Sequence, residues 1–144
     1  MRLTRWMHGL MLVSAAACSS SVTAPPSGLP ATLSAIQPVN GAPSSPTLTA
    51  ADNSVTAVFV SLANACSLSP TAAAGLSGAT LVMTVTSVEK HPGVPCPALV
   101  ALTVYSMTVR DVPRGTRTAK VVWRSVSGVS AENSVLITST ISLP

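Results

Sequence analysis

The chain has 144 residues, which is enough for one domain and too little for two separate hydrophobic cores. Charged residues make up only 8% of it and the formal net charge is +4, which argues against a nucleic-acid-binding domain, since such a domain usually has a clustered basic surface. Aromatic residues contribute 3%, and we therefore expect a core built mainly from Val, Leu, Ile, Ala and Met.

The N-terminal segment has the pattern of an export signal. Arg2 and Arg5 precede an apolar run that starts at Met7 and ends in Ser14-Ala15-Ala16-Ala17, directly before Cys18. A positive start, an apolar stretch too short to span a bilayer and a small-residue cleavage site are typical of a secretory signal peptide. Removal of the two arginines with this peptide would lower the formal net charge from +4 to +2.

The segment Ser14-Ala15-Ala16-Ala17-Cys18 resembles the signal of bacterial lipoproteins. This resemblance implies that residues 1–17 are removed, that Cys18 carries acyl chains such as palmitate, and that these chains hold the protein in the membrane. Ser19 after the cysteine implies the outer membrane. The same alanines also satisfy the A-x-A rule for simple secretory cleavage, which would leave Cys18 as a free thiol.

Residues 18–45 are expected to form a flexible linker, and residues 46–144 the folded domain. The linker is rich in serine and contains Pro25-Pro26, so it combines flexible and extended parts. Segment 31–39 allows two interpretations, because it could be a first edge strand anchored by Leu33 or a continuation of the linker.

Five later segments are expected to be strands, and they are 54–62, 80–88, 99–109, 118–126 and 133–143. Segment 80–88 alternates apolar and polar residues with the period of two that is typical of a half-buried strand. Segment 54–62 is fairly apolar on both faces, which suits a strand buried on two sides or covered at one end, and the apolar segment 99–109 is expected to be a core strand. The following sets share one face of their strand: Val55, Ala57, Phe59 and Ser61; Leu81, Met83 and Val85; Leu99, Ala101, Thr103, Tyr105, Met107 and Val109; Ala119, Val121, Trp123 and Ser125; Val135, Ile137, Ile141 and Leu143.

Loops are expected between these strands. Segment 64–78 contains Pro70 and two glycines, and its Ala72-Ala73-Ala74 could form one helical turn. Segment 89–97 contains three prolines, which cannot donate hydrogen bonds in a central strand.

Short strands separated by Pro/Gly turns, with no convincing helix, predict an all-β sandwich. The presumed hairpin 99–126, with the turn Pro113-Arg114-Gly115-Thr116, resembles the late hairpin of immunoglobulin-like and fibronectin type III-like domains. The resemblance implies an antiparallel Ig-like β-sandwich after the signal peptide and linker. Trp123 departs from the immunoglobulin pattern, since it follows both later cysteines instead of lying between them.

Cys66 and Cys96 are predicted to form a disulfide, because export places them in an oxidising compartment and lipidation removes Cys18 from the count. Closing a loop of about 30 residues would stabilise the domain by about 3–4 kcal/mol. The alternative is two free, buried thiols.

No constellation of catalytic or metal-binding residues is recognisable. Outside the signal peptide the chain has one histidine, His91, and four acidic residues, all in expected loops or turns: Asp52, Glu89, Asp111 and Glu132. Zinc would require several Cys or His ligands. We therefore predict no catalytic residue, no metal site and no cofactor, and we interpret Met83 and Met107 as core residues.

Basic residues gather around the presumed hairpin, and they are Arg110, Arg114, Arg117, Lys120 and Arg124. Lys120 and Arg124 project from the same strand face. They could form a solvated face that discourages edge aggregation. The functional interpretation is a contact with lipid head groups, an anionic glycan such as lipopolysaccharide, or an acidic envelope protein.

Together these patterns predict an envelope lipoprotein, anchored through Cys18, whose Ig-like domain has a non-enzymatic binding or structural role. The alternative is a small secreted enzyme or inhibitor that carries one disulfide and no lipid.

Overall fold

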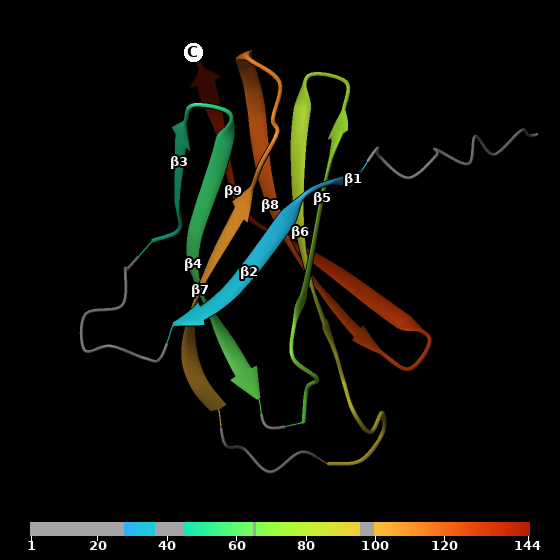
Figure 1. The fold of residues 1–144 in the computed structure, drawn as a ribbon. Coiled ribbons are helices and arrows are strands. Elements are labelled where there is room, and N and C mark those ends of the chain that lie inside the picture. Colours follow the sequence, from blue (N-terminus) through green and yellow to red (C-terminus); the bar gives the residue numbers. More distant parts are fainter. Residues whose placement is uncertain (1–27, 37–44, 65, 96–99) are drawn as a thin grey trace, which may run out of the picture.

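The computed structural model describes residues 28–36, 45–64, 66–95 and 100–144, and every regular element among them is a strand (Figure 1). No helix in this described part of the chain is able to cross a bilayer. The predicted signal peptide, Cys18 and Cys96 lie outside the described residues.

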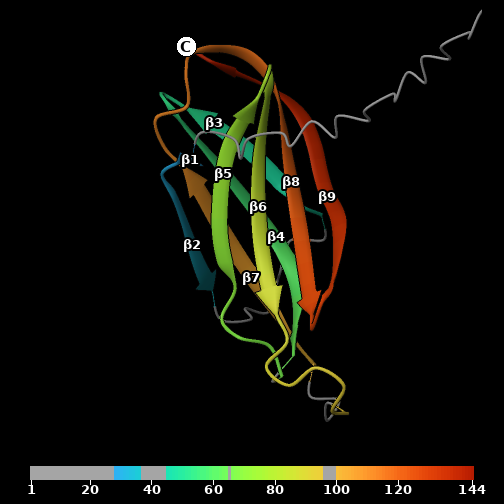
Figure 2. The ribbon, with the colours of Figure 1, turned by 90° about the vertical axis from the view of Figure 1, so that its right-hand side faces the viewer.

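Two sheets pack face to face, which confirms the predicted β-sandwich (Figure 2). One sheet has five strands in the order β1 (Gly28–Leu29), β5 (Thr71–Ser77), β6 (Thr80–Val88), β8 (Gly115–Ser127) and β9 (Ser130–Leu143). The other has four, in the order β2 (Ala31–Ile36), β7 (Val100–Val109), β4 (Ser54–Asn64) and β3 (Thr47–Ala51). Neighbouring strands are antiparallel except β6 and β8, which are parallel.

The core lies between the sheets and follows the predicted alternation. In β4 the inward residues are Val55, Ala57 and Phe59, all fully buried. The inward residues of β6, β7 and β8 are equally enclosed: Leu81, Met83, Val85, Met107, Val109, Ala119 and Val121. Full burial of one large aliphatic or aromatic side chain contributes about 1.5–3 kcal/mol, so this contiguous cluster is the main source of stability.

The predicted hairpin 99–126 is wrong, because β7 and β8 belong to different sheets. The intervening segment 110–114 carries the chain across the sandwich. Val112 is only 1% exposed within this connection, and its N–H donates to the carbonyl of Asn53 at 2.9 Å. Two strands separated by a turn have the same sequence pattern whether they pair in one sheet or belong to two different sheets.

The linker ends earlier than predicted, since residues 28–36 already belong to the sandwich. Pro30 separates β1 from β2 at the point where the chain passes from one sheet to the other. Its carbonyl accepts a hydrogen bond from the N–H of Arg110 at 2.9 Å. Leu33 packs against the core, so the edge-strand interpretation of this segment is the one confirmed.

Two further strands, β3 and β5, were not predicted from the sequence. The predicted loop 64–78 contains β5, so Ala72-Ala73-Ala74 is extended and forms no helical turn. Alanine and glycine have low strand propensity, but pairing with β6 along the whole of β5 supplies the missing backbone hydrogen bonds. Strand β3, which follows Pro46, is the edge strand beside β4, and pairing with β4 supplies its backbone hydrogen bonds.

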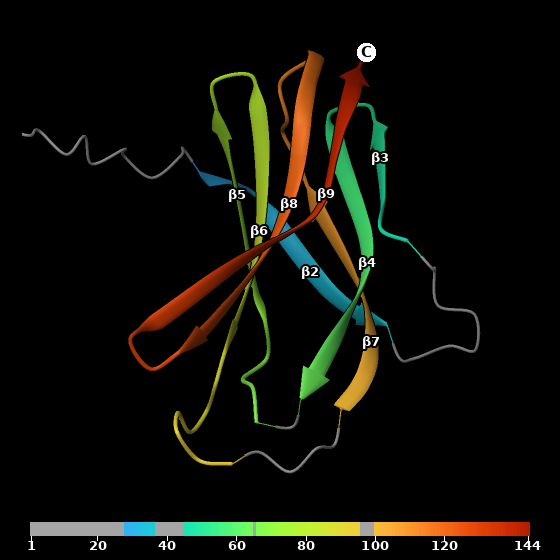
Figure 3. The same ribbon diagram turned by 180° about the vertical axis from the view of Figure 1, so that it is seen from behind.

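A β-bulge changes the last strand. Val121 and Val122 pair with Ile137 and Val135, so Leu136 is an extra residue in β9. The bulge exchanges the inward and outward positions of the residues that precede it in β9. Val135 is therefore 54% exposed, whereas Ile141 and Leu143 face the core as predicted. The β8–β9 hairpin also projects beyond the body of the sandwich (Figure 3).

The sandwich has two distinct ends (Figure 1). β1, the C-terminus, the β3–β4 and β5–β6 turns and the connection 110–114 lie at one end, which we call the attachment end. Segments 66–70 and 89–95 lie at the other, which we call the distal end.

Removal of the central aromatic ring tests this core. We expect Phe59→Ala to lower the free energy of unfolding by about 3–5 kcal/mol in urea denaturation, because it leaves a cavity between the sheets. Val135→Ala is the matched control and should change stability by about 0.5 kcal/mol or less, because Val135 is exposed. Equal effects of the two substitutions would contradict the described packing.

Candidate functional site

The three described aromatic side chains form one cluster between the sheets. Phe59 lies 5.9 Å from Tyr105 and 6.3 Å from Trp123 between ring centroids, and the Tyr105 and Trp123 centroids are 5.7 Å apart. Phe59 and Tyr105 are cross-strand partners in the four-stranded sheet, whereas Trp123 comes from β8 in the other sheet. The cluster therefore joins the two sheets.

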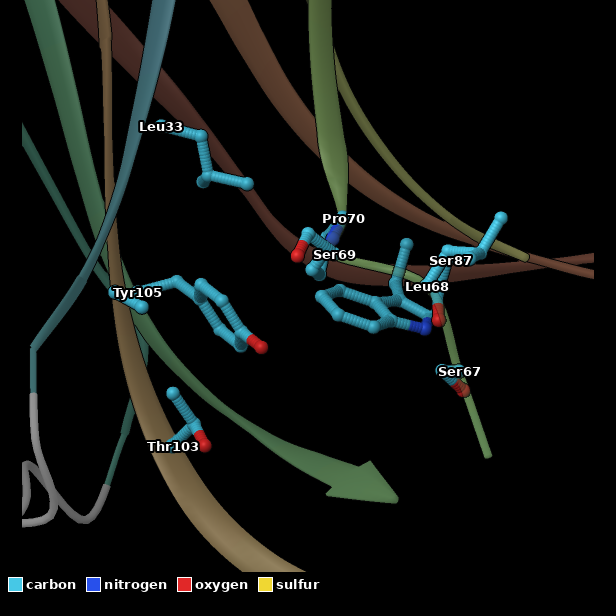
Figure 4. A pocket seen from close by; sticks show the side chains of 10 residues that line it. Leu33, Ser67, Leu68, Ser69, Pro70, Ser87, Thr103 and Tyr105 are labelled. Atoms are coloured by element: carbon cyan, nitrogen blue, oxygen red, sulfur yellow. The ribbon is translucent and has the colours of Figure 1, made fainter. Parts of the chain in front are cut away.

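A cavity of about 440 Å³ opens beside this cluster (Figure 4). Its volume lies in the range of small-molecule sites. Tyr105 extends from β7 toward Leu68 and Ser69 on the opposite wall, with Leu33 of β2 above it and Thr103 below it (Figure 4). The described residues that line the cavity are Leu33, Ala35, Ser67, Leu68, Ser69, Pro70, Ser87, Thr103, Tyr105 and Trp123.

The cavity exists because inward-facing positions become polar toward the distal end. In β6 the inward series Leu81, Met83 and Val85 continues into Ser87, and in β7 Tyr105 is preceded on the same face by Thr103. These short hydroxyl side chains do not fill the space between the sheets. The alternation in the sequence predicts that Thr103 and Tyr105 share a face, but it does not predict the cavity, whose sequence signal is this change from Val and Met to Ser and Thr.

The lining contains hydroxyl groups and apolar groups but no formal charge. None of the described lining residues is Lys, Arg, His, Asp or Glu. The hydroxyl of Tyr105 and the indole N–H of Trp123 make no hydrogen bond to another described residue. Both groups, together with the hydroxyls of Ser69, Ser87 and Thr103, are available to a bound molecule.

The five basic residues do not form one surface. Arg110 and Arg114 lie in the crossing connection at the attachment end, and Arg117 is bonded to this connection. Lys120 and Arg124 lie on the outer face of the five-stranded sheet, opposite the buried Ala119 and Val121.

Arg117 holds the crossing connection. Its Nη2 donates to the carbonyl of Pro113 at 2.7 Å and to that of Arg114 at 3.1 Å. Its Nε is buried and has no hydrogen-bond partner among the described residues. Because the guanidinium is occupied by backbone carbonyls, Arg117 has a structural role in this connection.

Lys120 and Arg124 have no acidic residue beside them on their face. Lys120 is flanked in register by Val82 and Thr138, and Arg124 by Thr86 and Asn133. The two cations are about 13 Å apart along the strand, from the usual rise per residue. By contrast, Arg114 lines a smaller hollow of about 330 Å³ together with Asp52, Asn53 and Pro144, where opposite charges are near.

No group of three or more His, Cys, Asp or Glu residues able to hold a metal occurs in the described ranges. His91 lies exposed in the turn at the distal end, and its carbonyl accepts from the N–H of Val94 at 3.2 Å. Glu89 accepts a hydrogen bond from the hydroxyl of Ser127, which ties segment 89–95 to the β8–β9 hairpin. Glu132 lies within β9, not in a loop as predicted.

The predicted disulfide involves one described cysteine, Cys66, and one outside the described residues, Cys96. The carbonyl of Cys66 accepts a hydrogen bond from the N–H of Lys90 at 2.7 Å. Cys66 follows Asn64 by two positions and Cys96 precedes Val100 by four, and the backbones of Asn64 and Val100 pair directly. These short chain lengths support the pairing, which stays a prediction.

No protein-family model, curated protein or solved structure matches the chain.

Reduction tests the cysteine pairing. We expect a reductant to lower the free energy of unfolding by about 3–4 kcal/mol, because the closed loop restricts the unfolded chain. The double variant Cys66→Ser/Cys96→Ser should have the lower stability from the start and should not respond to reductant in the same urea titration. An unmodified chain that ignores the reductant and titrates with two free thiols would contradict the disulfide.

Proposed function

We propose that this protein is an envelope lipoprotein, anchored through acyl chains on Cys18 and most consistent with the outer membrane, whose sandwich acts by binding and not by catalysis. The N-terminal pattern that ends in Cys18 supports the anchor. The uncharged cavity between the sheets is the observation that supports a binding role.

The position of the cavity suits a tethered protein. β1 starts at Gly28, ten residues after Cys18, so the connecting chain spans at most about 35 Å when fully extended. The chain joins the sandwich at the attachment end (Figure 1). Ser67, Ser69, Ser87 and Thr103 of the cavity belong to the distal half, so a lipid on Cys18 does not require the cavity to face the bilayer.

A second contact is proposed on the outer face of the five-stranded sheet. The residues that pair with Lys120 and Arg124 there carry no negative charge. By contrast, Arg114 lies near Asp52, and the Arg117 guanidinium donates to a backbone carbonyl. A pair of cations on a neutral Thr/Val surface is suited to an anionic lipid or glycan of the envelope. The proposed partners do not include nucleic acid.

Lipidation is tested by replacing its acceptor. We expect Cys18→Ser to move the protein from the detergent phase to the aqueous phase in detergent partitioning, and the mature chain to lose the added acyl mass. Cys66→Ser is the matched control and should remain in the detergent phase. A wild-type chain with an unblocked N-terminus in the aqueous phase would instead support the secreted enzyme or inhibitor.

The cation pair is tested with the Cys18→Ser chain, in which no lipid contributes to binding. We expect Lys120→Ala/Arg124→Ala to weaken binding to anionic phosphatidylglycerol vesicles about 10- to 30-fold at low salt, since each cation near such a surface contributes about 1 kcal/mol. Arg110→Ala/Arg114→Ala is the charge-matched control and should have a smaller effect. Unchanged affinity of the first variant at low salt would leave Lys120 and Arg124 as a solvated face only.

A further inference from the structure

We infer that the cavity beside Tyr105 and Trp123 binds a neutral saccharide. This inference deepens the proposed binding role and does not depend on the lipid at Cys18. It rests on which chemical groups line the cavity, which of them lack a partner within the protein, and how the aromatic rings are held.

A charged ligand does not suit the lining. No described lining residue is basic or acidic, so an anionic or cationic group placed inside would lose water without gaining a counter-ion. Lys120 and Arg124 occupy even-numbered positions of β8, whereas Trp123 occupies an odd-numbered one. The two cations therefore lie on the opposite face of the strand and point away from the cavity.

A purely hydrocarbon ligand does not suit it either. Hydroxyl groups come from β6, from β7 and from segment 66–70, in the residues Ser69, Ser87, Thr103 and Tyr105. An alkyl chain would cover these groups and offer them no hydrogen bond, and each unsatisfied buried hydroxyl costs about 1–3 kcal/mol. The ligand must therefore carry several hydroxyl or carbonyl groups of its own.

Trp123, which is partly exposed, gives the cavity an apolar wall, and the nearly buried Tyr105 ring supports it from behind. The Tyr105 and Trp123 rings are inclined at 48° to each other with centroids 5.7 Å apart. The face of an aromatic ring is electron-rich and attracts the polarised C–H bonds that cover one face of a sugar ring. A neutral saccharide combines such an apolar face with a rim of hydroxyl groups, and it is the ligand class that satisfies both kinds of lining.

These walls are already in position. Tyr105 is only 4% exposed and stacks on the fully buried Phe59, which also contacts Trp123 edge-on at 75°. Packing therefore fixes both rings before a ligand arrives, which reduces the entropy lost on binding. Leu68, at the rim, is 50% exposed and leaves the cavity accessible from solvent.

The chain provides its own reporter for this site. Trp123 is the only tryptophan after the predicted signal peptide, since the other is Trp6. The mature chain, purified in a polyoxyethylene detergent that has no sugar head group, would be titrated with glucose, galactose, N-acetylglucosamine, maltose and cellobiose. We expect at least one of them to give a saturable change in tryptophan fluorescence, with a matching heat in calorimetry.

Two substitutions on β2 locate the binding. Ala35 lines the cavity and Ser34 lies on the other face of the same exposed edge strand. Ala35→Phe should abolish saccharide binding by filling the space, whereas Ser34→Phe should retain it. Tyr105→Phe keeps the ring and removes one hydroxyl, and it should weaken binding about fivefold.

Several results would overturn the inference. These are the absence of any response to the neutral panel at tens of millimolar, binding of glucuronate or octanol in place of the neutral sugars, or full binding by Ala35→Phe. If circular dichroism shows that Ala35→Phe does not fold, the affinity of Tyr105→Phe is the test, and an affinity equal to that of the unmodified chain would then contradict the site. Failure of this titration leaves detergent partitioning unchanged, so it is distinguishable from failure of the lipid anchor.

Discussion

The contact of Phe59 with Tyr105 and Trp123 is the interaction on which the rest of this structure depends. It joins a ring pair of the four-stranded sheet to a ring of the five-stranded sheet at the point where large inward side chains end. Toward the attachment end the space is filled by Val, Leu, Met and Ala. Toward the distal end the inward residues are Ser and Thr, so the same rings that close the core on one side form the wall of the cavity on the other.

The crossing connection makes this contact possible. Had β7 and β8 formed the hairpin expected from their sequences, Tyr105 and Trp123 would lie in one sheet and could not face each other across the sandwich. Val112, buried in the core, and Arg117, bound to the carbonyls of Pro113 and Arg114, hold the connection in place. The same crossing separates the basic residues, since it leaves Arg110 and Arg114 at the attachment end and Lys120 and Arg124 on an outer sheet face.

Hydroxyl groups replace ions over much of the outer surface. One row of threonines crosses all four strands of the four-stranded sheet, from Thr32 through Thr108 and Thr56 to Thr49. Within it, the Thr56 and Thr108 hydroxyls lie 3.0 Å apart, and Thr49 donates to the carbonyl of Thr56 at 3.4 Å. Such cross-strand pairs stabilise a sheet modestly and keep its outer face polar. On this weakly charged background Lys120 and Arg124 are the two cations that we propose for contact with an anionic lipid or glycan.

The sequence alone determined the fold class and which residues share a face in the central strands, because a period of two along β4, β6, β7 and β8 is a local property. It placed Tyr105 on the face of Met107, and Trp123 on the face of Val121. Only the tertiary structure decided which strands are neighbours, that β5 is a strand despite its alanines, that the bulge at Leu136 turns Val135 outward, and that a cavity remains beside the aromatic cluster. These features depend on pairing and packing between residues far apart in the chain, and no local pattern records which distant partner supplies the hydrogen bonds or fills the space.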